Sequence, residues 1–437
     1  MSVRGRLFVM MVLEFFIWGA WLPLIFGYLP SLGFSPLQQS LILSAFPVAS
    51  IVGMFFSNQW ADRSASPERV LAVSHLIGGL AMLGCGFTRS FLPFFLLMLV
   101  HCLLYVPTIS ITNSIAFANM KNADKEFGIV RMGGTIGWIL AAWPFTFIFV
   151  NWAAVDALQP VGFVNWLGTA LANPLTGDAA KAATRWTFIV AGLASLALAA
   201  FSLVLPKTQA RALSTTRTAW AEAFSLLKQP FILVLWLVTL VDSFVHNAYF
   251  NWTGVFLGTA REAGGVGIAS NWITPVMSIG QVAEILTMVI LGGVLKTLGW
   301  RATMVVGILG HAARFLVYAM FPASAGMIIA VQILHGICYA FFFATVYIFV
   351  DAHSPKNIRA SAQGLFNLQI LGIGALLANS ICPWLLQSVY TSGGVTDFTG
   401  LFMVPLTAAT VAAIALALFF RPPTRGPGAA QEKRAAA

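Results

Sequence analysis

The apolar run over residues 269–295 carries an amide and an acid near its middle. Gln281 and Glu284 stand three residues apart, so both side chains lie on one face of a helix. A run of this length crosses a bilayer, and a carboxylate near its centre costs several kcal/mol unless it is paired, protonated or facing water. A hydrogen bond to a neighbouring helix, with no ligand, is the alternative explanation. We expect this face to be one wall of a substrate cavity.

The apolar run over residues 128–150 begins with a second polar and aromatic group. Arg131, Thr135 and Trp138 are spaced four and three residues apart and share one helical face. They offer a forked donor, a hydroxyl and a large aromatic plane, which suit a planar heterocycle with polar edges. In the alternative arrangement Arg131 extends to the headgroups and Trp138 faces lipid.

Two polar pairs follow one another in the run over residues 231–257. Asp242 and His246 are four residues apart, as are Asn247 and Asn251. An acid with a histidine one turn away can pass protons. A polar pair that only packs two helices explains the same pattern equally well.

The remaining ionisable groups in apolar runs have other expected roles. We expect Glu14 to line either the gate or the cavity, and Arg314 to reach the outer interface by extending its long side chain. His101 and His335 stand alone in long runs and are expected to be packing residues with satisfied hydrogen bonds. The sequence shows no phosphate-binding loop, metal-ligand cluster or nucleophile–base arrangement, so we expect no metal and no other cofactor, and neither an enzyme nor an ATP-driven pump.

The composition indicates which kind of secondary structure positions these residues. The chain has 437 residues, of which 59% are hydrophobic and only 9% are charged, and its mean hydropathy is +0.86. A soluble domain cannot cover its surface with so few charges, so the sequence predicts an all-α polytopic membrane protein. The net charge of +10 does not indicate nucleic-acid binding, because the basic residues lie in the loops between apolar runs.

Twelve apolar runs predict twelve transmembrane helices, approximately over residues 7–28, 38–60, 70–87, 91–118, 128–150, 186–205, 231–257, 269–295, 301–321, 325–350, 360–387 and 400–420. Assigning the loops alternately to two sides places eighteen lysines and arginines on one side and four on the other. This asymmetry predicts that the basic side, with both termini, is cytoplasmic.

The longest cytoplasmic connection divides the chain into two halves of six helices. We expect halves over residues 1–205 and 231–420, a linker over 206–230 and a disordered tail over 421–437. Two such halves around a site at the midplane are typical of secondary transporters. The external loop over residues 151–185 contains tryptophans that favour the headgroup region, and it is expected to form a short interfacial helix.

Several stretches resemble the nucleoside:proton symporters of the major facilitator superfamily. The resemblance covers nearly the whole chain in matching order and is most specific in the fifth and eighth predicted helices. The matching stretches are Trp18-Gly19-Ala20-Trp21, Tyr105-Val106-Pro107-Thr108, Arg131 with Gly134-Thr135-Ile136-Gly137, Ser278 with Gln281 and Glu284, and Ile358-Arg359-Ala360-Ser361-Ala362-Gln363-Gly364.

The resemblance implies the major facilitator fold and a set of pocket residues. The family's nucleoside pocket uses residues that match Arg131, Thr135, Gln281 and Glu284, an aromatic at the place of Trp138, and amides on the seventh helix, for which Asn247 and then Asn251 are the candidates. Some members also carry an aspartate on the tenth helix, where this chain has only Cys338-Tyr339-Ala340-Phe341-Phe342-Phe343. Proton coupling is therefore expected to depend chiefly on Glu284, with Asp242 and Glu14 as rivals.

The sequence and the resemblance together predict a monomeric carrier of the bacterial inner membrane that imports nucleosides by proton symport. A sugar or polyol carrier would use the same amide and acid but need less aromatic surface. An uncoupled nucleoside facilitator would need no proton-linked acid, and a sensor would bind a nucleoside without transporting it.

Overall fold

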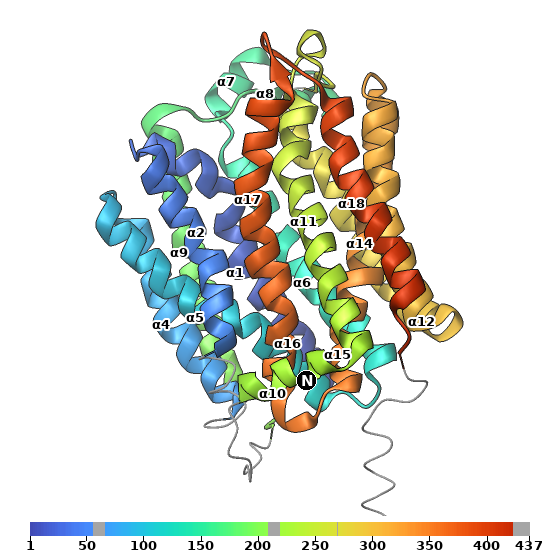
Figure 1. The fold of residues 1–437 in the computed structure, drawn as a ribbon. Coiled ribbons are helices and arrows are strands. Elements are labelled where there is room, and N and C mark those ends of the chain that lie inside the picture. The colour runs from blue at the N-terminus through green and yellow to red at the C-terminus, as the bar shows by residue number, and fades with distance from the viewer. Residues whose placement is uncertain (56–65, 209–218, 269, 423–437) are drawn as a thin grey trace, which may run out of the picture.

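The computed structural model of the protein describes residues 1–55, 66–208, 219–268 and 270–422. Within these ranges the chain forms a bundle of long helices (Figure 1). The first half contains α1 (Val3–Ser31), α2 (Pro36–Phe55), α4 (Pro67–Phe87), α5 (Phe91–Asn119), α6 (Ala123–Ile148) and α9 (Gly177–Ser202).

The second half begins with α11 (Pro230–Gly258) and the long helix α12 (Ser270–Met320), which contains two passes joined at Gly299. Gly299 has a φ of 70°, a left-handed conformation that a glycine adopts without steric cost. The bundle is completed by a pass over residues 325–353, a pass over residues 356–389 and α18 (Phe398–Phe419).

Two of these passes change their helical geometry on the way. The pass over residues 325–353 runs through α13 (Ala325–Ala330), η3 (Val331–Ile333), α14 (Leu334–Cys338), the π-helical turn η4 (Tyr339–Ala344) and α15 (Thr345–His353). The next runs through η5 (Lys356–Ile358), α16 (Arg359–Asn367), η6 (Leu368–Ile373), α17 (Gly374–Trp384) and η7 (Leu385–Val389). π-Helical turns of this kind often mark functional sites.

The prediction of twelve transmembrane helices is confirmed. Nine helices of the described ranges are long and apolar enough to span a membrane by themselves, α12 among them contributes a second pass, and α2 and α6 complete the set. The predicted start of the sixth helix was wrong, because α9 begins at Gly177 and not near residue 186. Its first turns carry Asp178, Lys181 and Arg185, which an apolar run does not include.

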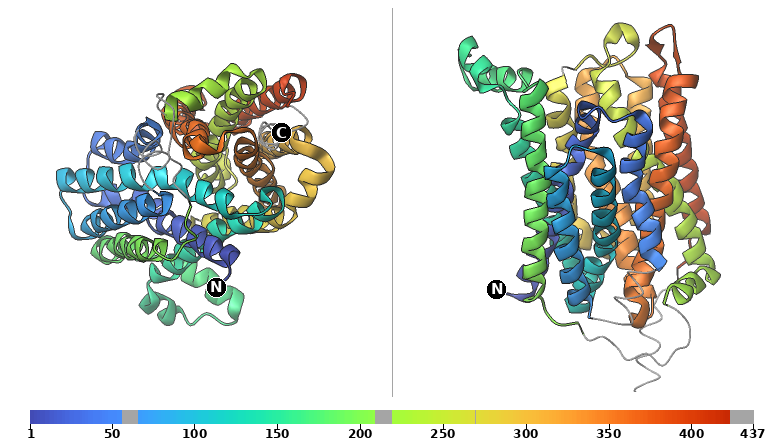
Figure 2. Two further views of the ribbon diagram at one scale, coloured as in Figure 1. Left: turned by 90° about the horizontal axis from the view of Figure 1, so that it is seen from below. Right: turned by 90° about the vertical axis from the view of Figure 1, so that its left-hand side faces the viewer.

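Buried apolar side chains form two large clusters. One draws its members from residues 7–205 together with Ala360, and the other from residues 219–420 together with Phe117 and Phe127. Seen from below, the blue to green helices lie mainly on one side and the yellow to red helices on the other (Figure 2). The start of α1 and the end of α18 lie at the same end of the bundle (Figure 1).

Helix α6 of the first half packs closely on α12 of the second. A Cβ atom added at Gly128 would collide with the carbonyl oxygen of Met288. The two backbones therefore approach closely at this point. This approach brings the face of Arg131 and Thr135 opposite the face that carries Glu284.

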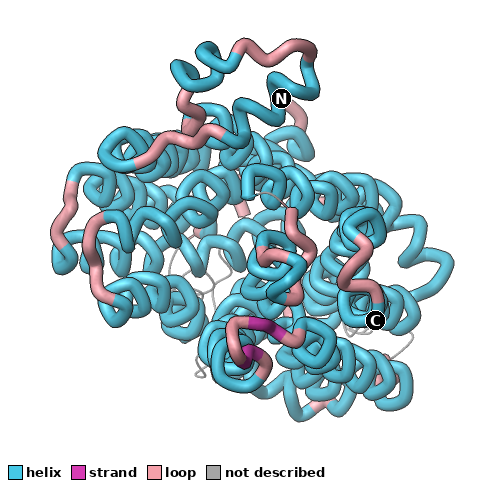
Figure 3. The backbone as a smooth tube through the Cα atoms, turned by 90° about the horizontal axis from the view of Figure 1, so that it is seen from above, coloured by secondary structure: helices cyan, strands magenta, loops and turns pink. Residues whose placement is uncertain are grey.

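The external loop contains two short helices where one was expected. They are α7 (Trp152–Leu158) and α8 (Phe163–Ala172), at the end of the bundle opposite the N-terminus (Figure 1). The rings of Trp152 and Trp166 stack with centroids 5.8 Å apart, which ties the two helices together. At the same end a hairpin of β1 (Thr391–Ser392) and β2 (Val395–Thr396) precedes α18 (Figure 3).

The predicted linker and tail are described only in part. The linker contains α10 (Ala219–Ser225) and η1 (Leu226–Lys228), and its residues 209–218 lie outside the described residues. The tail predicted to be disordered also lies outside them from residue 423 onward.

Candidate functional site

Arg131 lies inside the bundle, between the two halves. It is only 4% exposed, and its guanidinium carbon lies 3.9 Å from the ring centroid of Phe15 on α1. The guanidinium also donates a hydrogen bond to the hydroxyl of Tyr339 on η4. An arginine in this position does not reach the headgroups, so the alternative in which Arg131 extends to the membrane surface is wrong. Arg131 instead connects α1 and α6 of the first half with η4 of the second.

Thr135 and Glu284 make a second direct contact between the halves. The Thr135 hydroxyl donates a hydrogen bond of 2.6 Å to Oε1 of Glu284, and both residues are buried. This bond partly satisfies a carboxyl group that would otherwise be isolated at this depth. Gln281 lies one turn away on the same helix and is half-buried, so the amide and the acid share a wall.

Trp138 lies at an aromatic corner beside this wall. Its ring meets the ring of Trp18 edge-on, with centroids 5.3 Å apart, and Trp18 in turn stacks on Phe46 at 4.7 Å. Gly19 allows α1 to approach this point, because a Cβ atom there would lie 2.9 Å from the Cα atom of Trp138. Phe15 links this corner to Arg131, because its ring centroid lies 6.2 Å from that of Trp18 and 3.9 Å from the guanidinium carbon.

The two asparagines of α11 bond their own helix, and Asn251 also bonds α17. The side-chain amide of Asn247 donates to the carbonyl oxygen of Ser243 at 2.8 Å. The amide of Asn251 donates to the carbonyl oxygen of Asn247 at 3.0 Å and to Oδ1 of Asn379 on α17 at 3.2 Å. In the described part of the chain, no hydrogen bond joins either asparagine to Arg131, Thr135 or Glu284.

Asn367, at the end of α16, joins the halves a third time. Its side-chain amide donates to the Ser110 hydroxyl of α5 at 2.8 Å, and the Ser50 hydroxyl of α2 donates to its backbone oxygen at 3.1 Å. Tyr347 of α15 holds the asparagine in place by donating to its Oδ1 at 2.6 Å. These four buried residues are called the Asn367 latch below. Figure 1 shows α16 at the end of the bundle that carries the N-terminus.

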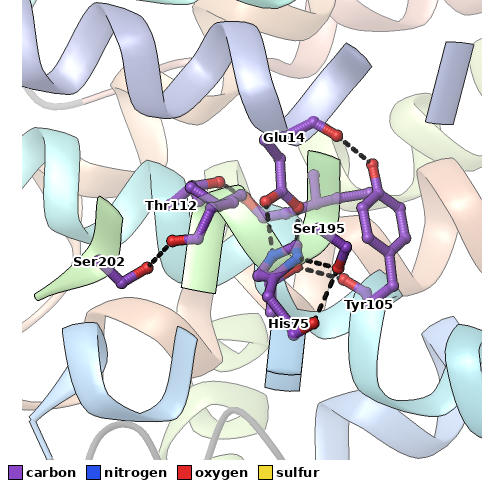
Figure 4. A network of polar contacts seen from close by, with 9 residues as sticks. Glu14, His75, Tyr105, Thr112, Ser195 and Ser202 are labelled. Atoms are coloured by element: carbon purple, nitrogen blue, oxygen red, sulfur yellow. Dashed lines mark hydrogen bonds and ion pairs between the residues drawn. The ribbon is translucent and has the colours of Figure 1, made fainter. Parts of the chain in front are cut away.

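Glu14 lies within the first half and points away from the wall. Its Oε2 lies 3.0 Å from Nε2 of His75 on α4 (Figure 4). Its Oε1 accepts a hydrogen bond of 2.7 Å from Thr108 on α5. Tyr105 donates to its backbone oxygen at 2.7 Å. Among the described residues, no ion pair or hydrogen bond links this carboxylate to Arg131 or Glu284.

Asp242 pairs with a residue that the sequence did not indicate. Its Oδ1 lies 2.8 Å from Nδ1 of His311 on the second pass of α12, so the predicted pairing with His246 was wrong. Spacing along one helix identifies neighbours on that helix, but a partner from another helix is closer here. His246 instead lies beyond His311, with 3.5 Å between their ring nitrogens.

Arg314 and His335 also depart from expectation. Arg314 is fully buried, donates to Nδ1 of His335 at 3.0 Å and lies over the ring of Tyr249 at 3.9 Å. It does not reach the outer interface, because its face of the helix points into the second half, where an aromatic ring stabilises its charge. His335 is therefore part of a polar cluster. His101 is a buried packing residue as expected, with its Nδ1 3.0 Å from the carbonyl oxygen of Gly78, but its Nε2 has no hydrogen-bond partner among the described residues.

Sequence reasoning missed His75 and Asn367. His75 is a polar residue within the apolar run over residues 70–87, a signal that was present and not used. Asn367 carries no comparable signal, because its role comes from a contact with a helix more than two hundred residues away in sequence.

Comparison with known proteins identifies the family. A family model described as Nucleoside H+ symporter matches residues 1–161 and 151–425. The chain is similar to the putative nucleoside transporter YegT of Escherichia coli K12, with 28% identity over 433 residues that cover 96% of this chain and 94% of that protein. It is also similar to the xanthosine permease of the same strain, with 26% identity over 423 residues and 92% of each chain covered.

Solved structures agree on the fold. A crystal structure of the nucleoside transporter NupG superimposes with a TM-score of 0.65 at 22% identity, over 97% of this chain and 100% of that one. The Escherichia coli fucose:proton symporter FucP gives 0.70 at 12% identity, over 96% and 98%. The fold is that of the major facilitator superfamily, with twelve helices, as the resemblance implied. Because the family model covers almost the whole length, the chain belongs to the nucleoside H+ symporter family.

Proposed function

We propose that the protein imports nucleosides together with protons by alternating access. The observation that carries this proposal is the opposition of two polar faces from different halves, which the Thr135–Glu284 bond connects, in a member of this family. Substrate sites at the contact between two halves are typical of secondary transporters. We further propose that the moving bodies are residues 1–205 and 231–420, which correspond closely to the two buried clusters.

The chemistry of the walls suits a nucleoside. The base would stack on Trp138 and Tyr339, two aromatic planes near Arg131, whose forked donors suit the polar edges of the base. The ribose hydroxyls would bind Gln281 and Glu284. Asn247 and Asn251 would reach the substrate only when their helix moves toward the wall.

Glu284 would be the proton-linked group at the substrate. When ionised, it accepts a charge-assisted bond from Thr135 that holds the two walls together. When protonated, it loses the negative charge that strengthens this bond, and it can donate as well as accept toward a ribose hydroxyl. A proton from outside would therefore favour separation of the walls and substrate entry.

The basic loops support an orientation with both termini in the cytoplasm. We also propose that the membrane is the bacterial inner membrane and that the protein acts as a monomer. In this orientation the Asn367 latch closes the cytoplasmic end. The described state would then be the one that receives substrate from outside. Release inside would require the latch to open.

Competition uptake into proteoliposomes tests the substrate. Labelled uridine should enter and should be displaced by other nucleosides, but not by free bases or sugars. Displacement by sugars would favour a sugar or polyol carrier. Binding without any net flux would favour a sensor and contradict transport.

A further inference from the structure

Each half contains a buried pair of a carboxylate and a histidine, placed between its first and third passes. In the first half Glu14 of α1 meets His75 of α4 at 3.0 Å. In the second half Asp242 of α11 meets His311 of α12 at 2.8 Å. All four side chains are fully buried. The positions correspond between the halves, but the surroundings of the two pairs differ.

In the first half, the polar side-chain atoms of the pair all have partners, and we call this pair closed. Oε1 of Glu14 accepts from Thr108, and Oε2 faces Nε2 of His75. Ser195 uses its hydroxyl hydrogen to donate to the backbone oxygen of His75 at 2.9 Å, so Nδ1 of His75 must donate to the Ser195 oxygen (Figure 4). One proton is therefore held between Nε2 and Oε2, and every nitrogen and carboxylate oxygen of the pair has a partner.

In the second half, one carboxylate oxygen of the pair has no partner among the described residues, and we call this pair open. Oδ2 of Asp242 is buried and has no hydrogen-bond partner among the described residues. Nε2 of His311 faces Nδ1 of His246 at 3.5 Å, so the pair continues into a third titratable group. The ring of His246 stacks on that of His335 at 5.4 Å. His335 cannot extend the path at Nδ1, because this nitrogen accepts a hydrogen bond from Arg314.

The pair is connected to the proposed substrate wall through His335, whose ring stacks on that of His246. A Cβ atom added at Gly280 would lie 2.7 Å from Cβ of His335, so α14 packs tightly against the helix of Gln281 and Glu284. The ring of His246 lies 6.2 Å from the ring of Tyr339, whose hydroxyl is bonded to Arg131. A change at His246 can thus reach a residue of the site through one aromatic contact.

We infer that Asp242, His311 and His246 form a second proton-binding site of the transport cycle, separate from Glu284. The inference rests on the proposed function. One proton enters at Nε2 of His246, whose Nδ1–H passes its proton to Nε2 of His311, and the Nδ1–H of His311 passes its proton to Oδ1 of Asp242. Release reverses these transfers, and the proton count is conserved. The other titratable or charged groups facing this path are Arg314, His335, Cys338, Tyr249 and Tyr339.

The charge of Arg314 couples protonation of this site to the conformation of the second half. Arg314 is one turn from His311, and its Nε and one terminal nitrogen have no partner among the described residues. Asp242 pairs with His311, so an ionised Asp242 would lie in the same buried cluster as this positive charge and would offset it. Protonation of Asp242 leaves the charge uncompensated, which is costly in a low-dielectric interior. Protonation of Asp242 should therefore favour a different packing of the second half.

The test compares Asp242→Asn and His311→Gln with the parent in proteoliposomes. Both should exchange labelled uridine for internal uridine. Because Glu284 still couples one proton in both variants, each should concentrate uridine about tenfold under an imposed gradient of one pH unit, whereas the parent, with two coupled protons, should reach about a hundredfold. Glu14→Gln, the matched change in the closed pair, should lower thermal stability but keep the response to the gradient.

Three results decide the inference. Accumulation by Asp242→Asn equal to that of the parent would overturn it. Should Asp242→Asn and His311→Gln unfold, His246→Gln carries the test, since it breaks no ion pair, and parental accumulation by it would equally overturn the inference. A parent that accumulates no uridine contradicts the proposed function itself and removes the basis of the inference.

Discussion

The Asn367 latch makes a quantitative prediction about the balance between conformations. Asn367→Ala removes two side-chain hydrogen bonds, to Ser110 and from Tyr347, and leaves the Ser50 bond to the backbone intact. The Tyr347 bond lies within the second half and persists whichever end is open, so its loss affects stability alone. The Ser110 bond joins the halves, so its loss shifts the balance between the two states.

The magnitude follows from that single bond. A buried hydrogen bond contributes about 1 kcal/mol net, so the ratio of latched to open cytoplasmic ends should fall about fivefold. Ser110→Ala removes the same bond from the other side and should produce the same shift. Tyr347→Phe should lower stability without shifting the ratio, and the Asn367→Ala/Ser110→Ala double variant should add little to either single change.

Spin labels at the cytoplasmic ends of the two halves measure this ratio. Lys121→Cys and Ala352→Cys place labels at exposed positions, and the four native cysteines are buried and need not be removed. The longer of two distance populations should gain about fivefold relative to the shorter one in Asn367→Ala. Unchanged populations in both Asn367→Ala and Ser110→Ala would show that the latch does not set the balance between the states.

Three further predictions concern the walls of the site. Arg131→Ala or Gln281→Ala should abolish nucleoside binding while the protein stays folded, because each change leaves polar edges of the ligand unpaired. If calorimetry shows that Gln281→Ala binds as tightly as the parent, the wall of the substrate site is assigned to the wrong residues. Trp138→Phe should keep most affinity, whereas Trp138→Ala should lose about 1–3 kcal/mol of binding, by analogy with base stacking on aromatic side chains; equal affinity in all three proteins would place this ring away from the base. Glu284→Gln should bind nucleoside with an affinity that varies less with pH than that of the parent, and a pH dependence equal to that of the parent would assign the proton at the substrate to another group.

The sequence alone was sufficient to predict where the helices lie and which residues share one face of a helix. Continuous apolar runs locate the passes because a bilayer sets their length. The spacing of Arg131 and Thr135, and of Gln281 and Glu284, correctly places each pair on one face. It could not show that these faces meet, which depends on the close approach of α6 to α12 at Gly128.

The errors share one physical cause. Arg314, Asp242 and His335 have partners on other helices, and the rotation of a helix about its axis is set by packing that a single run does not record. An arginine near a helix end reaches water only if its face is turned outward. Glu14 was expected at a gate or cavity, but its partner His75 holds it inside the first half.

Uptake of labelled uridine by the purified protein in proteoliposomes, with and without an imposed pH gradient, tests the central claim most directly. We predict accumulation above the equilibrium level only when the outside is more acidic, and collapse of the gradient should release the accumulated uridine. Equilibration at the same final level with and without the gradient would show an uncoupled facilitator and contradict proton symport.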